Sequence, residues 1–573
     1  MSEPVPQQPS PKPPLRYLAA LLFLLSFAYR LIGIGWGLPN DLHHHSYHPD
    51  EPIVLMYSQE IEPGRLDFDP GFYHYGTLYL TLVRLASAQV QAFTGGPDPK
   101  EPESVRRFVG DSHLASRVIS ALAGAGTVLI AFLVFRRWAS PLAASLGALL
   151  IAVAPGHVVH SRFATVDITA SFLLAVSALF ALRCLPNPGE TEEDAESRAR
   201  RTGRWAILSG LFAGLGAGTK YTGILGLLTL LTVLLIARPP RSWKLGLLGV
   251  TAAAVGFLAS TPGALVNFAA FSRDFAEEAL HVATGHGIYF VQVGSGFAFH
   301  LMNLAEGIGG FLVVLSTAGL FLAPARLRAP LFALLAFAIP YYLLIGKSQV
   351  MFLRYTFPLY FLLAFGIVCL VERAFESPRW GRWAVVFGML GLGGVPIWGG
   401  LRASAVMTLW MAGEDPRDSA ARLLKRELAK TDDATVGIPS DPWYYTPPVF
   451  PNSAAPRQLF LPFFEGYRQE ALRAGVVQYV PPNPRDRFDW DVRLLTELEP
   501  AYVVFSSFEA KDLERLKDRK GLDPVVSLIV SRYKEFLDEL KSRYAPFAVY
   551  GDGFDLMHDL EYIRPTIWIW KRK

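Results

Sequence analysis

The sequence predicts a polytopic α-helical membrane protein that ends in a soluble α/β domain. About half of the 573 residues are apolar, at 51%, and the mean hydropathy is positive at +0.28, which is unusual for a soluble enzyme of this length. Apolar runs long enough to cross a bilayer recur over residues 15–400. After residue 400 the composition shifts towards charge, and strand-like segments alternate with helix-like ones.

About eleven transmembrane helices are expected from the apolar runs. The predicted spans are 16–35, 115–135, 140–158, 166–184, 204–219, 221–237, 244–261, 298–322, 330–346, 355–372 and 383–400. Lys and Arg cluster in alternate loops, which places the N-terminus in the cytoplasm. An odd number of spans then places the C-terminal region outside it.

These spans divide the chain into three parts. A disordered cytoplasmic tail rich in Pro and Gln covers residues 1–14, and the transmembrane domain covers 15–400. An extracytoplasmic α/β domain covers 401–573. Within the transmembrane domain, the outer loop 36–112 contains helix-like segments that are too short or too polar to span, so we expect interfacial helices there.

Composition excludes several classes of protein. The net charge is only +4, and the basic residues form no stripe, so nucleic acid is not an expected partner. The two cysteines, Cys184 and Cys369, lie in apolar segments, which argues against a disulfide framework and favours small core residues.

The first candidate motif is Tyr47-His48-Pro49-Asp50-Glu51-Pro52, directly after the first span. An aspartate here can accept a proton from an attacking hydroxyl, or it can bind a divalent metal with His48. The alternative is a helix start, where acids are favoured. Both interpretations can hold, because a capping Glu51 would keep Asp50 in place.

Two further groups follow at predicted outer helix ends. Asp167 opens an apolar run, as either a helix cap or a second acid, and Arg162 before it could meet an anion. Lys220 lies in a glycine-rich turn, where a lysine suits a phosphate, although a lysine that snorkels to the interface is the alternative. The glycine spacing does not fit a nucleotide P-loop.

More cations lie at the same predicted face. Arg354 lies in a short outer loop, and Arg117 opens the second span. Charge is costly at helix ends near lipid unless it is paired or used. Several cations that converge with two acids therefore predict a site for an anionic lipid headgroup.

Taken in order, the motifs resemble the GT-C class of glycosyltransferases, in particular the bacterial dolichyl-phosphate-mannose protein mannosyltransferase and aminoarabinose–lipid A transferase relatives. The stretches that carry this resemblance are His48 to Glu51, His74 to Tyr79, Ala115 to Leu122, Ser161 to Asp167, Gly216 to Tyr221, and Arg354-Tyr355.

The resemblance implies a GT-C-like fold and a role for each site residue. Asp50 would be the catalytic base or acceptor-site acid, Glu51 would support it, and Asp167 would be the second acid. Lys220 and Arg354 would hold the phosphate of a polyprenyl-phosphate sugar. The remaining candidate substrate contacts are Arg117, Arg162, His74, Tyr75 and Tyr355.

The predicted function is therefore an inverting glycosyltransferase of the cytoplasmic membrane. It would move a sugar from a polyprenyl-phosphate donor to a hydroxyl of a protein, lipid or polysaccharide at the outer face. No cofactor is certain, and a divalent metal on His48 and Asp50 stays open. The alternatives are a transporter or lipid flippase, against which the lack of a visible repeat argues, and an assembly protein that acts through its C-terminal domain.

Overall fold

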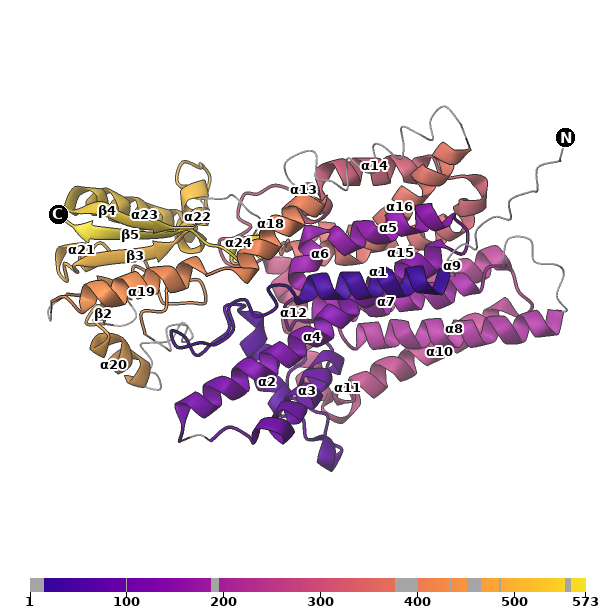
Figure 1. The fold of residues 1–573 in the computed structure, drawn as a ribbon, viewed down its shortest axis with the longest axis horizontal. Coiled ribbons are helices and arrows are strands. Elements are labelled where there is room, and N and C mark those ends of the chain that lie inside the picture. The colour runs from indigo at the N-terminus through magenta and orange to yellow at the C-terminus, as the bar shows by residue number, and fades with distance from the viewer. Residues whose placement is uncertain are drawn as a thin grey trace, which may run out of the picture.

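The computed structural model describes residues 15–98, 100–186, 195–376, 400–431, 434–450, 465–483, 486–551 and 558–573. A helical body is joined to a smaller domain built around a sheet (Figure 1). The predicted tail 1–14, and all of the predicted span 383–400 except its last residue, lie outside the described residues.

The helical body follows the predicted spans closely. Its helices are α1 (Leu15–Leu31), α4 (Pro102–Phe135), α5 (Pro141–Val153), α6 (Pro155–His160), α7 (Val166–Arg183), α8 (Ala195–Ala217), α9 (Gly226–Ala237), α10 (Ser242–Ser260), α13 (Gly296–Ile308), α14 (Gly310–Phe321), α15 (Arg328–Gly346) and α16 (Phe357–Phe375). Among the described residues, five helical segments are long and apolar enough to cross a membrane. The protein is thus a multi-pass membrane protein.

Two predicted spans are broken helices. The span 298–322 is divided into α13 and α14 at Gly309, whose φ of 119° suits glycine far better than other residues. The span 140–158 is divided at Ala154, which is extended because Pro155 follows it. The two predicted spans 204–219 and 221–237 correspond to α8 and α9. They are joined by the turn at Lys220 and the short helix η2 (Tyr221–Leu225).

Shorter helices gather at one end of the body, as Figure 1 shows. They are α2 (Asp50–Gln59), η1 (Pro63–Arg65), α3 (Leu78–Thr94), α11 (Gly263–Val266), α12 (Phe268–Thr284) and η4 (Leu353–Thr356). Buried Val54, Leu55 and Leu80 pack α2 against α3. The helix α3 starts at Leu78, directly after Gly76 packs against the backbone of Gly218, and the Leu78 N–H donates to the Gly218 carbonyl at 2.9 Å.

The C-terminal domain is α/β, as predicted. Its elements are α18 (Gly400–Ala412), α19 (Pro416–Leu428), β1 (Val436–Gly437), α20 (Glu465–Arg473), β2 (Val476–Val477), α21 (Arg493–Thr496), β3 (Tyr502–Ser506), α22 (Ser507–Leu516), α23 (Pro524–Arg543), β4 (Tyr544–Tyr550), α24 (His558–Glu561) and β5 (Ile567–Arg572). The sheet order is β2-β1-β3-β5-β4, with β1 parallel to both its neighbours and β5 antiparallel to both of its own. The sequence analysis did not predict β2 or β4.

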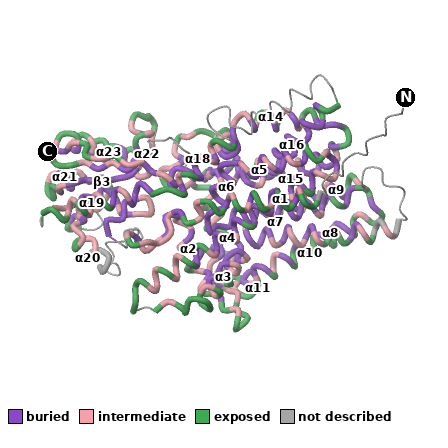
Figure 2. The backbone as a smooth tube through the Cα atoms, viewed as in Figure 1, coloured by how far each residue is buried: buried purple, intermediate pink, exposed green. Residues whose placement is uncertain are grey.

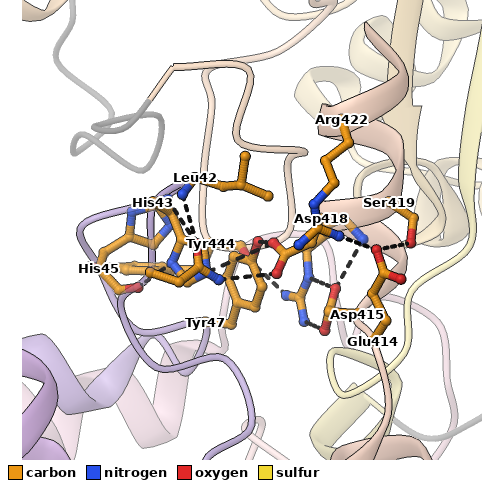
Figure 3. A network of polar contacts seen from close by, with 12 residues as sticks. Leu42, His43, His45, Tyr47, Glu414, Asp415, Asp418, Ser419, Arg422 and Tyr444 are labelled. Atoms are coloured by element: carbon orange, nitrogen blue, oxygen red, sulfur yellow. Dashed lines mark hydrogen bonds and ion pairs between the residues drawn. The ribbon is translucent and has the colours of Figure 1, made fainter. Parts of the chain in front are cut away.

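A buried polar network joins this domain to the outer loop. Arg417 is fully buried and forms two 2.7 Å hydrogen bonds with Asp415, and its guanidinium lies 3.7 Å from the Tyr47 ring centroid. The Tyr47 hydroxyl donates to Asp418 (Figure 3). The Arg417 guanidinium also donates to the Tyr562 carbonyl at 3.0 Å. Two distant parts of the chain are therefore fixed to each other beside the motif around Asp50.

Buried residues recur along the helices of the body (Figure 2), and glycines allow one of its close helix contacts. A Cβ added at Gly210 would lie 1.9 Å from the Gly249 carbonyl oxygen, and one at Gly214 would lie 2.1 Å from that of Ala253. Small residues at such crossings let two helix backbones approach within van der Waals contact. The contact between α8 and α10 thus depends on glycine at these positions.

We expect Gly214→Ala to lower the stability of the purified protein by about 1–3 kcal/mol, the usual cost of an overpacked methyl group. A fall in the midpoint of thermal unfolding in detergent would measure it. The matched control is Gly203→Ala on the same helix, where the new Cβ meets Leu245 at 3.5 Å, an ordinary contact. Equal midpoints for the two variants would contradict the packing argument.

Candidate functional site

Asp50 and Glu51 share the first turn of α2 but face different surroundings. The helix starts after Pro49, and the Asp50 N–H donates to His48 Nδ1 at 3.2 Å. The Asp50 side chain keeps 39% of its surface exposed, whereas Glu51 is fully buried. Both acids lie at a helix start, as the alternative interpretation predicted, and only Asp50 faces open space.

Glu51 is held by Arg117. The Arg117 guanidinium donates to both carboxylate oxygens, at 2.8 Å and 2.7 Å, and to the carbonyls of Ile34 and Trp36 at 2.7 Å and 2.6 Å. The backbone N–H of Ala164 donates to Glu51 at 2.7 Å. Burial alone would raise the pKa of Glu51, but the charge and hydrogen bonds of Arg117 outweigh it and hold that pKa well below its usual range. Glu51 thus ties the outer loop to α4 and to the segment that leads into α7.

Asp167, Lys220 and Arg354 meet beside Asp50. The Lys220 Nζ donates to Asp167 Oδ1 at 2.6 Å, and Arg354 Nε lies 3.8 Å from Asp167 Oδ2. A second nitrogen of Arg354 lies 3.4 Å from Asp50 Oδ2, and Lys220 Nζ lies 4.2 Å from the Tyr355 ring centroid. We call Asp50, Asp167, Lys220, Arg354 and Tyr355 the acid–cation cluster.

The cluster is assembled from four separate segments. Asp50 comes from the start of α2, Asp167 from the first turn of α7, Lys220 from the turn before η2, and Arg354 from η4. The exposed fraction of the side chain falls from 39% at Asp50 and 25% at Lys220 to 16% at Arg354 and 6% at Asp167. A ligand would therefore meet Asp50 and Lys220 first, with Asp167 behind them.

Two tyrosines lie near Asp50. Burial, followed by the charges of Asp50 and Asp167, raises the pKa of Tyr75 well above its usual value. Burial and then the charge of Asp50 raise the pKa of Tyr444 to about 12. Tyr75 is one of the predicted substrate contacts. Next to Tyr444, Tyr445 stacks on Phe508 at a centroid distance of 4.7 Å. Only the domain contact reveals that Tyr444 lies near the cluster.

The other proposed substrate contacts, apart from the cluster's Tyr355, have partners outside the cluster. The Arg162 guanidinium is fully buried and donates to the Tyr29 carbonyl at 3.0 Å and the Thr408 hydroxyl at 2.9 Å. The Arg117 guanidinium is paired with the Glu51 carboxylate. His74 lies 3.9 Å from each of two acids on α12, Glu277 and Glu278, which the sequence analysis did not single out.

The residues do not favour a metal on His48. Its Nδ1 accepts the Asp50 N–H, and its ring packs on Phe163 and Tyr562 at centroid distances of 4.5 Å and 5.2 Å. Among the described residues, the three side chains close enough to share an ion are His74, Asp274 and Glu277. Asp274 is engaged by Arg273 at 2.7 Å and by the Tyr73 N–H at 2.8 Å, so this group also has internal partners.

Several solved structures resemble the chain at low sequence identity. The oligosaccharyltransferase AglB from Archaeoglobus fulgidus, in complex with an inhibitory peptide and a dolichol-phosphate, aligns with 94% of this chain and 73% of its own, at 14% identity and a TM-score of 0.49. ArnT from Cupriavidus metallidurans bound to undecaprenyl phosphate aligns over 97% and 98%, at 15% identity and a TM-score of 0.47. The protein O-mannosyltransferase complex Pmt1-Pmt2 of S. cerevisiae aligns over 48% and 38%, at 15% identity and a TM-score of 0.28.

One protein-family model matches the sequence directly. No curated protein sequence matches the chain significantly. The model of the dolichyl-phosphate-mannose-protein mannosyltransferases matches residues 99–271, which include Arg117, Asp167 and Lys220. This match confirms, over residues 99–271, the resemblance to the dolichyl-phosphate-mannose-protein mannosyltransferases that the motifs indicated.

Proposed function

We propose that the protein transfers a sugar from a polyprenyl-phosphate donor to an acceptor hydroxyl. The observation that carries the proposal is the acid–cation cluster, in which the partly exposed Asp50 lies beside Arg354, and Asp167 links Arg354 to Lys220. Such a cluster combines a proton acceptor with donors for a phosphate. The mannosyltransferase match over residues 99–271 supports the same chemistry for the segment that supplies Asp167 and Lys220.

We assign this site to the outer face of the cytoplasmic membrane. Asp167 lies in the first turn of α7 and Arg183 in its last turn, with Arg136 and Arg137 following α4 at the same end as Arg183. Basic residues concentrate at the cytoplasmic ends of membrane helices. The cluster at the opposite end of α7 would therefore face outwards, together with the C-terminal domain.

The proposed reaction is a single displacement at the anomeric carbon. The acceptor oxygen attacks that carbon as its proton passes to Asp50, and the bond from the carbon to the phosphate oxygen breaks with its electron pair left on the phosphate. Lys220 and Arg354 would neutralise the charge that grows there. Attack opposite the leaving group inverts the anomeric centre.

In the proposed resting state, Asp167 substitutes for the phosphate. Two cations at a membrane surface need a counter-charge, and Asp167 supplies it at 2.6 Å from Lys220 and 3.8 Å from Arg354. A donor phosphate would share these cations with Asp167. Tyr355 and Tyr75 would line the same space, and Tyr444 would close it from the C-terminal domain.

Glu51 and Arg117 act in this proposal as positioning residues. Both side chains are fully buried, so neither is assigned a substrate contact. Their pair holds the first turn of α2, and with it Asp50, against α4. We divide the chain accordingly into a catalytic membrane domain over 15–400 and an extracytoplasmic domain over 401–573 that covers the site.

We expect Asp50→Asn to lower the rate of sugar transfer by about 10²–10⁴-fold, the usual contribution of a general base. The measurement is the conversion of a panel of polyprenyl-phosphate sugars in membranes that contain the protein, with the products identified by mass. Asp41→Asn, in the same outer loop but exposed over 93% of its side chain, is the matched control. Full activity of Asp50→Asn would exclude Asp50 as the base.

Lys220→Gln should weaken the binding of polyprenyl phosphate by about 10- to 100-fold, because a hydrogen bond to a charged group contributes about 1.5–3 kcal/mol. Titration of the purified variant with undecaprenyl phosphate measures the loss. Lys347→Gln removes an exposed lysine from the loop that carries Arg354 and should bind as the unaltered protein does. Equal affinities in all three proteins would refute the phosphate role of Lys220.

Glu51→Gln should destabilise the protein by about 3–5 kcal/mol, because it leaves the Arg117 charge buried without its counter-ion. Thermal unfolding in detergent measures this effect, and Asp50→Asn is the comparison, since it should unfold at an unchanged temperature. If Glu51→Gln instead lost transfer activity at full stability, Glu51 would be a direct participant and not a positioning residue.

A further inference from the structure

A cavity lies far from the acid–cation cluster, between α4, α7 and α8. Its volume is about 330 Å³, and three arginines and two tryptophans form its polar rim: Arg137, Arg183, Arg201, Trp138 and Trp205. The rest of the lining is leucine and valine, and none of the nine lining residues is acidic. Neither the catalytic proposal nor the family resemblance uses these residues.

The cavity and the cluster are separated by most of the length of α7. Asp167 lies in the first turn of α7, and the cavity residue Leu182 lies in its last turn. At 1.5 Å per residue the two are about 23 Å apart along the helix. A bilayer core is about 30 Å thick, so the cavity lies near the membrane face opposite to the cluster.

Two of the arginines, Arg137 and Arg183, are held in place by contacts within the protein. Arg137 donates to the carbonyls of Leu182 and Leu185, at 2.9 Å and 2.5 Å, which satisfies the open end of α7. The Arg183 guanidinium lies 4.9 Å from the Trp205 ring centroid. A guanidinium fixed by such contacts loses little conformational freedom when it binds an anion.

The surroundings of the cavity are apolar. Leu133 at its edge is 41% exposed, although it lies in a helix long and apolar enough to span the membrane. Tryptophan is enriched where hydrocarbon meets headgroups. The cavity therefore places three arginine side chains at headgroup depth, next to an apolar surface that an acyl chain can follow.

We propose that this cavity binds the phosphate of an anionic phospholipid in the cytoplasmic leaflet. Arginine recognises phosphate through paired hydrogen bonds, and basic pockets between membrane helices are suited to lipid headgroups. The volume is at the lower end of the range for small-molecule sites, which suits a headgroup with its tails outside. This lipid site is independent of the proposed transfer reaction.

The test is lipid retention measured by native mass spectrometry on the full chain in detergent, titrated with phosphatidylglycerol or phosphatidylcholine. We expect phosphatidylglycerol to bind at least tenfold more tightly than phosphatidylcholine. The double variant Arg183→Gln/Arg201→Gln should lose this preference. Arg328→Gln, which removes an exposed arginine at the start of α15 outside the cavity, should keep it.

A second variant leaves every charge in place. Leu133→Trp should fill the mouth of the cavity and weaken phosphatidylglycerol binding at least tenfold, while the midpoint of thermal unfolding without lipid stays within about 2 °C of that of the unaltered protein. Displacement of the lipid by an equal concentration of inorganic phosphate would overturn the lipid assignment in favour of a free anion. Equal retention of both lipids, or full retention by the double arginine variant, would overturn the site itself.

Discussion

The buried ion pair between Glu51 and Arg117 is the constraint on which the geometry of the site depends. Arg117 lies within α4, and Glu51 lies one residue after Asp50. The same carboxylate accepts the Ala164 N–H three residues before Asp167. One side chain thus fixes the distance between the two acids of the cluster. A buried pair of this kind contributes little to net stability but is costly to break, so it specifies geometry more than it adds free energy.

The acid–cation cluster is stabilised by a balance of opposite charges. Two negative and two positive charges form a chain of ion pairs that runs from Lys220 through Asp167 and Arg354 to Asp50. A balanced set can sit at the end of a membrane helix without a bound ligand, where a single charge would be expensive. Asp167 already holds Lys220 and Arg354 near each other. A bound phosphate would therefore take over contacts from Asp167 and would not require the two cations to move far.

Much of the helical body could be predicted because its signal is local. Apolar runs and basic loops predict α7, α10 and α16 within a few residues, and they predict the end of α4 but not its start at Pro102. The clustering of Asp50 with Lys220 follows from placing helix ends on one face. Arg162 and Arg117 show the limit of that reasoning. Both lie near the helix ends that the sequence predicted for the site, yet their side chains point into the protein. Arg162 donates to the Tyr29 carbonyl, and Arg117 donates to Glu51. A sequence gives the position of an arginine along a helix, but its partner is set by the packing of distant segments.

Tyr444 illustrates what depends on tertiary structure alone. It is 394 positions from Asp50 by its number in the chain, and it reaches the cluster because Arg417 donates to its carbonyl at 2.9 Å while packing on the Tyr47 ring. The Tyr47 ring belongs to the same motif as Asp50, so the contact that docks the C-terminal domain also orders the loop that leads to Asp50. An aromatic side chain brought in this way can exclude water from a site and strengthen every charge interaction within it. Docking of the domain and assembly of the cluster are therefore coupled through Tyr47, and movement of the C-terminal domain would alter the environment of Asp50 without any change in the helical body.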